Sequence, residues 1–178
     1  MARDDVREIY DGRIVKLRLE RVALPNGQTV TLEIMRHGGA SAVAAVDATG
    51  RVTLIRQYRH AAGGYLWELP AGVLHGAGEA PQACAERELR EEVGLSARSW
   101  RHLGTILTTP GFCDERIHLF LARDLEEGEH ARDADEVIAE TRAVPLAEAV
   151  AMIRRGEIVD GKTIAGLYLA ADALREAA

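Results

Sequence analysis

Three glutamates, Glu88, Glu91 and Glu92, are spaced three and four residues apart in a segment with a helical pattern. On a helix this spacing brings the three carboxylates close together on one face, where like charges repel unless a cation compensates them. Hard oxygen ligands suit Mg²⁺ or Mn²⁺, and Mg²⁺ usually also binds water and substrate phosphate. The cluster predicts a divalent metal site that acts on a phosphorylated substrate. The alternative is a solvated acidic face balanced by Arg87 and Arg90.

The predicted helix that carries these glutamates extends from Glu79 to Val93. Pro81 suits its first turn, and Gly94 supplies a stop after its last turn. An apolar stripe that includes Leu89 repeats every four residues, as expected for a helix that packs on a core through one face.

Alternating apolar residues predict strands on both sides of this helix. The longest alternation spans residues 13–36 and is interrupted by Asn26-Gly27, a typical hairpin turn. Strands and helices are mixed without regular βαβ alternation, which indicates an α/β (α+β) domain. Further strands are expected at 41–46, 52–58, 67–69, 100–107, 116–122 and 137–144, and two more helices around 146–153 and 164–174.

Composition narrows the class of protein. A chain of 178 residues with 47% hydrophobic residues suits one compact domain, and the net charge of −6 without a Lys/Arg cluster argues against nucleic-acid binding. We find no apolar stretch of the roughly 20 residues that cross a bilayer, and the acidic start does not resemble a signal peptide. We therefore expect a cytoplasmic protein that does not enter membranes, with Cys84 and Cys113 as reduced thiols of the core.

A longer pattern surrounds the glutamates. It consists of Glu68-Leu69-Pro70-Ala71-Gly72, a loop, Glu79, seven residues, and then Arg87-Glu88-Leu89-Arg90-Glu91-Glu92-Val93-Gly94-Leu95. This order resembles the Nudix box, and every fixed position from Glu79 to Leu95 matches. One departure is that six residues, not five, separate Gly72 from Glu79; two glycines in this loop are expected to absorb the insertion without disturbing the helix.

Other segments resemble the ADP-ribose pyrophosphatase branch of the Nudix superfamily. They are residues 56–59, 67–70 and 110–116, and Pro110 lies 15 positions after Leu95, as is usual in ADP-ribose hydrolases. The resemblance implies a Nudix α/β/α sandwich with a mixed β-sheet. It also implies an N-terminal β-hairpin region at 1–38 that forms a homodimer, followed by the hydrolase domain at 39–178.

The activity implied by this resemblance is metal-dependent hydrolysis of ADP-ribose to AMP and ribose 5-phosphate. Mg²⁺ is the expected ion, with Mn²⁺ or another divalent ion as a substitute. The runner-up is a Nudix hydrolase of another nucleoside diphosphate derivative, such as a nucleotide sugar or a dinucleoside polyphosphate. A third possibility is a Nudix domain that binds a nucleotide without hydrolysing it.

Metal-binding roles follow from the matched positions. Glu88 and Glu92 are the expected ligands, Glu91 is a supporting ligand or water contact, and the Ala71 carbonyl completes one site. Arg87 is expected to orient the carboxylates. Two interpretations of Glu79 stay open: a weak metal or structural contact, or simple stabilisation of the helix N-terminus.

The general base is expected in an acidic loop after the box, where Glu136 is our choice and Asp135 and Glu140 compete with it. Tyr58, Trp67 and Phe112 are candidates for stacking on adenine, although aromatic residues beside strands usually belong to the core. Arg59 has the guanidinium fork that suits paired phosphate oxygens, whereas Arg56 would face the other side of the strand. The expected substrate contacts are Arg59, Glu68, Pro110, Phe112 and Glu115.

Overall fold

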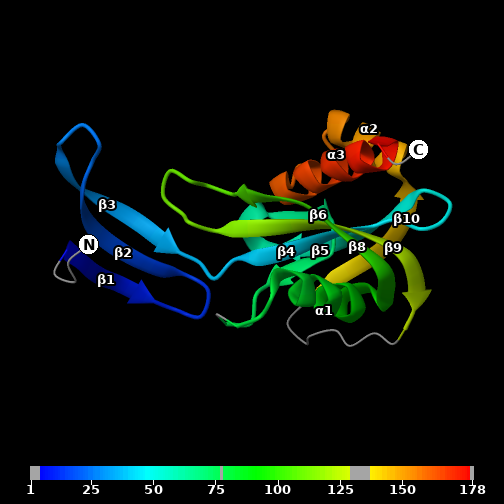
Figure 1. The fold of residues 1–178 in the computed structure, drawn as a ribbon, viewed down its shortest axis with the longest axis horizontal. Helices are drawn as coiled ribbons and strands as arrows, with labels where there is room; N and C mark the ends of the chain where they lie inside the picture. The colour runs from blue at the N-terminus through cyan, green and yellow to red at the C-terminus, as the bar shows by residue number, and fades with distance from the viewer. Residues whose placement is uncertain (1–4, 77, 129–136, 177–178) are drawn as a thin grey trace.

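The computed structural model describes residues 5–76, 78–128 and 137–176. Its first three strands form an antiparallel sheet of their own, in the order β1-β2-β3, which projects from one end of the body (Figure 1). The predicted hairpin is therefore part of a three-stranded lobe. The strands are β1 (Val6–Asp11), β2 (Lys16–Ala23) and β3 (Thr29–Arg36).

The body contains two further sheets, one in the order β7-β4-β9-β8 and one in the order β10-β5-β6. In the first sheet β4 runs parallel to β9 and antiparallel to β7, so the sheet is mixed, as predicted. The strands are β4 (Ala40–Ala45), β5 (Arg51–Arg59), β6 (Gly64–Glu68), β7 (Ala71–Val73), β8 (Leu95–Leu107), β9 (Arg116–Glu127) and β10 (Ile138–Pro145).

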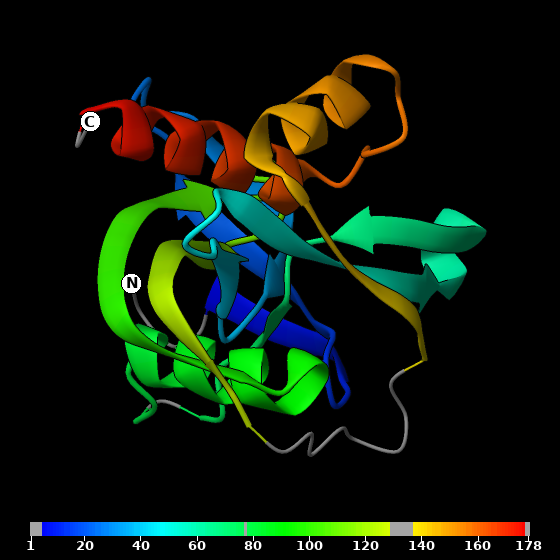
Figure 2. The same ribbon diagram turned by 90° about the vertical axis from the view of Figure 1, so that its right-hand side faces the viewer.

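Helices cover both faces of these sheets. Helix α1 (Pro81–Val93) lies on one side, and α2 (Leu146–Arg154) and α3 (Gly161–Glu176) lie on the other (Figures 1 and 2). Leu89 of α1 is fully buried in a cluster with β4 and β5 side chains, and Leu167 of α3 is fully buried in a second cluster. The three layers confirm the α/β/α sandwich, and the side of α1 and the first residues of α3 border a common cleft.

The predicted start of α1 at Glu79 is wrong by two residues. Ala80 is extended, with φ −68° and ψ 140°, and Pro81 occupies the first turn. The Glu79 carboxylate lies outside the helix, where it accepts hydrogen bonds from Arg87. Gly94 ends the helix with φ 67°, as predicted, so the six-residue loop does not disturb α1.

Two strands were not predicted. The residues of β1 are all exposed, so its sequence lacks the alternation that marks a half-buried strand. β7 has only three residues, of which Ala71 and Gly72 are types depleted in strands, and it forms through pairing with β4. The strand expected at residue 100 begins at Leu95 instead.

Both cysteines are free, but only Cys84 is buried, whereas Cys113 is partly exposed. Burial raises the pKa of the Cys84 thiol to about 11, so it stays protonated at neutral pH. In the part of the chain that the structure describes, no helix has both the length and the apolar character to cross a membrane.

Candidate active site

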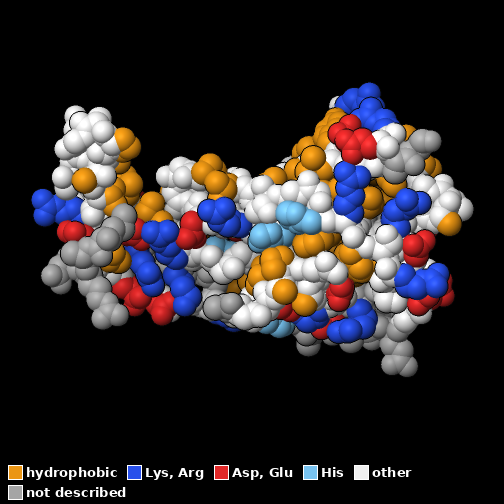
Figure 3. All heavy atoms as spheres, in the orientation of Figure 1, with side chains coloured by type: hydrophobic (Ala, Val, Ile, Leu, Met, Phe, Trp, Pro, Cys, Tyr) orange, Lys and Arg blue, Asp and Glu red, His pale blue; other side chains and the backbone are white. Residues whose placement is uncertain are grey.

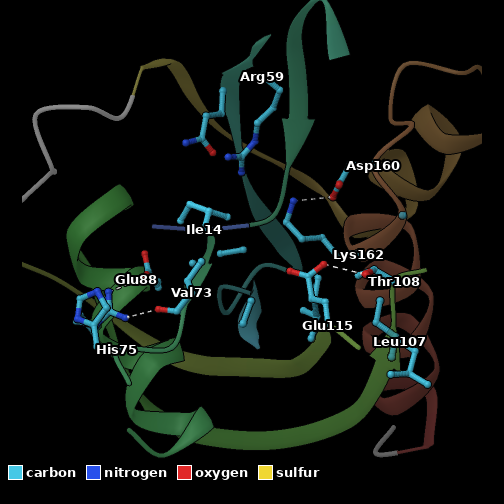
Figure 4. Close-up of a pocket in the computed structure, with 18 of the residues that line it drawn as sticks. Ile14, Arg59, Val73, His75, Glu88, Leu107, Thr108, Glu115, Asp160 and Lys162 are labelled. Carbon is cyan, nitrogen blue, oxygen red and sulfur yellow. Dashed lines mark hydrogen bonds and ion pairs between the residues drawn. The ribbon is translucent and has the colours of Figure 1, made fainter. Parts of the chain in front are cut away.

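A cleft of about 1080 Å³ lies between the N-terminal part of α3, the end of β5 and the side of α1. Figure 4 shows Glu88 entering the cleft from one side, and Lys162 and Glu115 from the opposite side. We call the side with Glu79, Glu88, Glu91 and Glu92 the acidic wall. The cationic wall consists of Arg59, Glu68, Asp160 and Lys162.

Glu88 and Glu92 of the acidic wall are 5% and 0% exposed, respectively. The Oε2 atom of Glu92 accepts a hydrogen bond from the Ala71 amide at 2.9 Å. A Cβ atom at Gly72 would overlap the Glu88 carboxylate, so only glycine lets this carboxylate approach the backbone of β7. The Ala-Gly segment and the glutamates of α1 thus form one unit.

Arg87 connects the carboxylates of this wall. Its guanidinium donates hydrogen bonds to Glu79 at 2.9 Å, to Glu88 at 2.5 Å and to Glu91 at 3.0 Å. Burial alone lowers the pKa of Arg87, but the three carboxylates outweigh burial and raise it. The hydrogen bond from Arg87 in turn lowers the pKa of Glu79. Glu79 therefore makes the structural contact that was one of its two interpretations.

The donor set fits a divalent cation. Three carboxylates gather around the Arg87 guanidinium, the Glu92 carboxylate binds the Ala71 amide on the same wall, and carboxylate oxygens are the ligands that Mg²⁺ prefers. Within residues 5–76, 78–128 and 137–176, no three acidic, His or Cys side chains already converge as a complete ligand set. Glu88 and Glu91 are turned toward Arg87. A bound ion would compete with Arg87 for these oxygens; there it would polarise the phosphoryl group and lower the pKa of a water molecule.

The cationic wall is organised by Glu68, which is only 1% exposed. Arg59 donates two hydrogen bonds to its carboxylate, both at 2.8 Å, and Lys162 donates a third at 2.5 Å. Burial by itself raises the pKa of Glu68, but the bonds from Arg59 and the charge of Lys162 outweigh it and lower the pKa. Glu68 thus holds two cations that border the cleft.

Lys162 was missed in the sequence because it lies 94 residues from Glu68 and belongs to no chemical motif. One local signal was available in the sequence, since Asp is a typical N-cap residue of a helix. In the structure, Asp160 indeed accepts a hydrogen bond from the Thr163 amide in the first turn of α3. That signal locates the start of α3 but not its neighbours. Gln57 was missed too; it is 4% exposed, lines the cleft, and its Oε1 has no hydrogen bond to any residue that the structure describes.

Of the other predicted substrate contacts, some line the cleft and some lie outside it. Arg59, Glu115 and the aromatic Tyr58 line the cleft, whereas Pro110 and Phe112 lie at an exposed loop outside its lining. Tyr58 and Phe112 are 41% and 51% exposed, so the core interpretation is wrong for both. Trp67 is partly buried and packs against the core, with Arg142 over its ring. Arg56 stacks on Tyr65, away from Arg59.

The predicted base, Glu136, lies outside the described residues, as does its competitor Asp135. Glu140, the other competitor, binds Arg142 on the surface. Val137, which directly follows Glu136, lines the cleft, and its carbonyl accepts a hydrogen bond from the Tyr58 amide at 3.0 Å.

Comparison with known proteins agrees with this geometry. The family model of the NUDIX domain matches residues 35–167, which include both walls of the cleft. The chain belongs to the Nudix family. The structure of this Nudix chain is also similar to a crystal structure of an ADP compounds hydrolase, with a TM-score of 0.83 and 23% identity over 97% of this chain and 92% of that one. That likeness supports the fold.

Relatives of this Nudix protein share most of its length. An ADP-ribose pyrophosphatase of Mycobacterium tuberculosis is 44% identical over 89% of this chain and 77% of its own. A methanol dehydrogenase activator of Bacillus methanolicus is 40% identical, over 88% and 85% of the two chains. An ADP-ribose pyrophosphatase of Bacillus subtilis is 38% identical, over 88% and 84%.

Proposed function

We propose that this Nudix hydrolase cleaves the diphosphate of ADP-ribose with the help of a divalent ion, giving AMP and ribose 5-phosphate. The observation that carries the proposal is the position of the buried Glu88, one turn of α1 from the buried Glu92, across one cleft from Arg59 and Lys162. A diphosphate needs both features. The carboxylates would hold a divalent ion on one side of its negative oxygens, and Arg59 and Lys162 supply positive charge on the other side. Two relatives at 44% and 38% identity are named for this reaction.

The residues of the two walls then have separate tasks. In the reaction, a water oxygen forms a bond to one phosphorus while the bond from that phosphorus to the bridging oxygen breaks. Arg59 and Lys162 bind phosphoryl oxygens, because both line the cleft while Glu68 holds them in place. Glu88 and Glu92, supported by Glu91 and the Ala71 carbonyl, would hold the ion.

The water that attacks phosphorus must lose a proton, and we assign the acceptor role to Glu136. Support comes from its neighbour in the chain, Val137, which lines the cleft. A carboxylate is a suitable acceptor when its proton partner is made acidic in the site. Exchange of Glu136 for Gln is expected to lower kcat with little change in KM.

Mg²⁺ is the ion we propose, with Mn²⁺ as a substitute, since both prefer the oxygen ligands of the acidic wall. We place the reaction in the cytoplasm, in keeping with two free cysteines. The substrate we propose is a small nucleoside diphosphate and not a nucleic acid, because a net charge of −6 disfavours binding to a long polyanion.

A homodimer formed through residues 1–38 is part of the proposal. The lobe of β1, β2 and β3 projects from the body and carries hydrophobic side chains among charged ones (Figure 3). Its exposed apolar residues include Ile9 at 46%, Tyr10 at 60% and Ile14 at 49% exposure. Such a surface is typical of an interface with another chain. Light scattering at micromolar concentration is expected to give twice the chain mass; a stable monomer would contradict this part.

The substrate is tested by a panel. Purified protein with Mg²⁺ is given ADP-ribose, several nucleotide sugars and dinucleoside polyphosphates, and the products are separated by chromatography. We expect the highest kcat/KM for ADP-ribose, with AMP and ribose 5-phosphate in equal amounts. A higher kcat/KM for another diphosphate would keep the chemistry and change the specificity, whereas no turnover of any diphosphate would overturn the proposal.

A further inference from the structure

The loop between β8 and β9 is fastened to the N-terminal lobe. Its Phe112 carbonyl accepts a hydrogen bond from the Met35 amide at 2.7 Å, and its Asp114 amide donates to the Met35 carbonyl at 3.2 Å. Met35 and Cys113 also pair as neighbouring strands do. The loop, which spans residues 108–115, therefore continues the sheet of β3 at its end.

Arg36 adds ion pairs to this connection between the lobe and the loop. Its Nε and Nη2 donate to the two oxygens of Glu20 at 2.9 and 2.6 Å, and its Nη1 donates to Asp114 at 3.0 Å. Glu20 is 4% exposed, so Arg36 is fixed at one end by a buried carboxylate of β2. The hydrogen bonds that Arg36 donates, first to Glu20 and then to Asp114, raise the pKa of Arg36, so it remains charged.

Asp114 connects the fixed Arg36 to a residue that lines the cleft. Besides Arg36, it binds the His37 amide at 2.8 Å, and the next residue along the chain is Glu115, which lines the cleft. Glu115 accepts a hydrogen bond from the Thr108 hydroxyl at 2.8 Å, as Figure 4 shows. These two side chains enter the cleft opposite Glu88.

His37 does not replace this connection. Its Nδ1 lies 3.4 Å from a Glu115 oxygen, but that nitrogen accepts a hydrogen bond from the Gly39 amide at 3.0 Å. A nitrogen that accepts a hydrogen bond carries no proton and cannot donate one to Glu115. Asp114 and Arg36 thus remain the charged link between the lobe and the loop.

We propose that Arg36 and Asp114 are positioning residues for substrate specificity, which hold Glu115 and Thr108 against the hydroxyl-bearing group at the end of the diphosphate remote from Glu88. A carboxylate and a hydroxyl side by side accept and donate hydrogen bonds as sugar hydroxyls require. The inference rests on the proposed function, because it assigns one end of the same cleft to the sugar. It makes recognition of that sugar depend on the β1-β2-β3 sheet and not only on helix α1.

The main test variant is Asp114→Ala, which cuts the link at a 40% exposed side chain and leaves Glu20 paired with Arg36. We expect KM for ADP-ribose to rise about tenfold while kcat stays within about twofold, because the acidic wall is untouched. Arg36→Met should act in the same direction, and Arg36→Lys should restore only part of the loss, since lysine lacks the fork. Arg18→Met is the matched control on β2, where Arg18 lies 3.9 Å from Glu8 in an exposed ion pair.

Two further measurements separate positioning from a general loss of folding. In Asp114→Ala, hydrogen exchange should become faster at the amides of the loop 108–115 other than Pro110, and stay unchanged elsewhere in the cleft. Calorimetry with the methylene-bridged analogue of ADP-ribose should show a Kd about tenfold higher than in the parent protein. An unchanged KM and Kd, or a loss confined to kcat, would overturn the inference.

These readouts also keep the two proposals apart. Binding of the analogue without hydrolysis of any diphosphate would end the proposed function, while the analogue would still test Arg36 and Asp114. Normal hydrolysis with the same KM in every variant would overturn only the positioning role. A parent protein that binds no analogue at all would overturn both.

Discussion

The charged side chains are paired differently on the two walls of the cleft. On the acidic wall, Arg87 is the hub for several carboxylates that come from α1 and from Glu79, just ahead of it. On the cationic wall, Arg59 and Lys162 come from β5 and α3 and are matched by Glu68 and Asp160. The acidic wall therefore has an excess of negative charge that an added cation would relieve. On the cationic wall two positive and two negative side chains are joined by ion pairs, which hold Arg59 and Lys162 in position to orient a substrate.

The largest effect is expected from a substitution in the acidic wall. Glu92→Gln should lower kcat about a thousandfold, because it removes a charge that the divalent ion needs while keeping the shape of the side chain. Glu86→Gln is the matched control, since Glu86 is an exposed residue of the same helix that accepts a hydrogen bond from Gln82. Steady-state rates with circular dichroism check both; a similar loss in the two variants would contradict a specific role for Glu92.

The next effect tests whether the backbone of β7 belongs to the acidic wall. Gly72→Ala should reduce kcat/KM about a hundredfold, because the new methyl group would displace the Glu88 carboxylate. At Gly78 a Cβ would meet nothing within 4 Å, so Gly78→Ala serves as the control. Kinetics of both variants decide the matter, and full activity of Gly72→Ala would separate β7 from the site.

A smaller effect is expected on the cationic wall. Lys162→Met should raise KM for ADP-ribose about tenfold with less change in kcat, because one donor to the phosphoryl oxygens is lost and Arg59 remains. The control is Lys16→Met, at an exposed lysine paired with Asp11 in the lobe. Should Lys162→Met lower kcat as strongly as Glu92→Gln, the proposed division of tasks between the walls would be wrong.

The smallest effect concerns pH. The pKa of Glu68 lies below its ordinary value of about 4.3, so the native state favours the ionised form. This contribution to stability is present above about pH 4.3 and is lost as the pH falls through the lower native pKa. Urea unfolding between about pH 3 and 6 should show the decline, with a shallower slope in Lys162→Met. An identical slope in both proteins would separate Lys162 from the charge state of Glu68.

The same contrast explains what the sequence predicts. The acidic wall depends on helical spacing within one segment, and for that reason the sequence alone groups Glu88, Glu91, Glu92 and Arg87. Periodicity and turn residues predicted one domain of mixed strands and helices, whereas the α/β/α layers were implied by the resemblance to the Nudix box. The start of α1 was misplaced because Glu79 serves Arg87 and does not enter the helix.

Contacts between distant segments escaped prediction. The pairs Lys162 with Glu68 and Arg36 with Asp114 are 94 and 78 residues apart, and neither has a local pattern that marks its partner. β7 is similar, because its pairing with β4 and not its own three residues makes it a strand. The sequence thus locates the clustered carboxylates, whereas the fold assembles the opposite side of the cleft.

The central claim is that the carboxylates of the acidic wall hold the ion on which hydrolysis depends. Its most direct test is the initial rate of AMP formation from ADP-ribose as Mg²⁺ is titrated, for the parent protein, Glu86→Gln and Glu92→Gln. We predict a saturable rise for the first two, no rate with excess chelator, and almost no rate for Glu92→Gln at any Mg²⁺ concentration. A rate that persists in chelator, or a Glu92→Gln variant with the parent's Mg²⁺ dependence, would contradict the account.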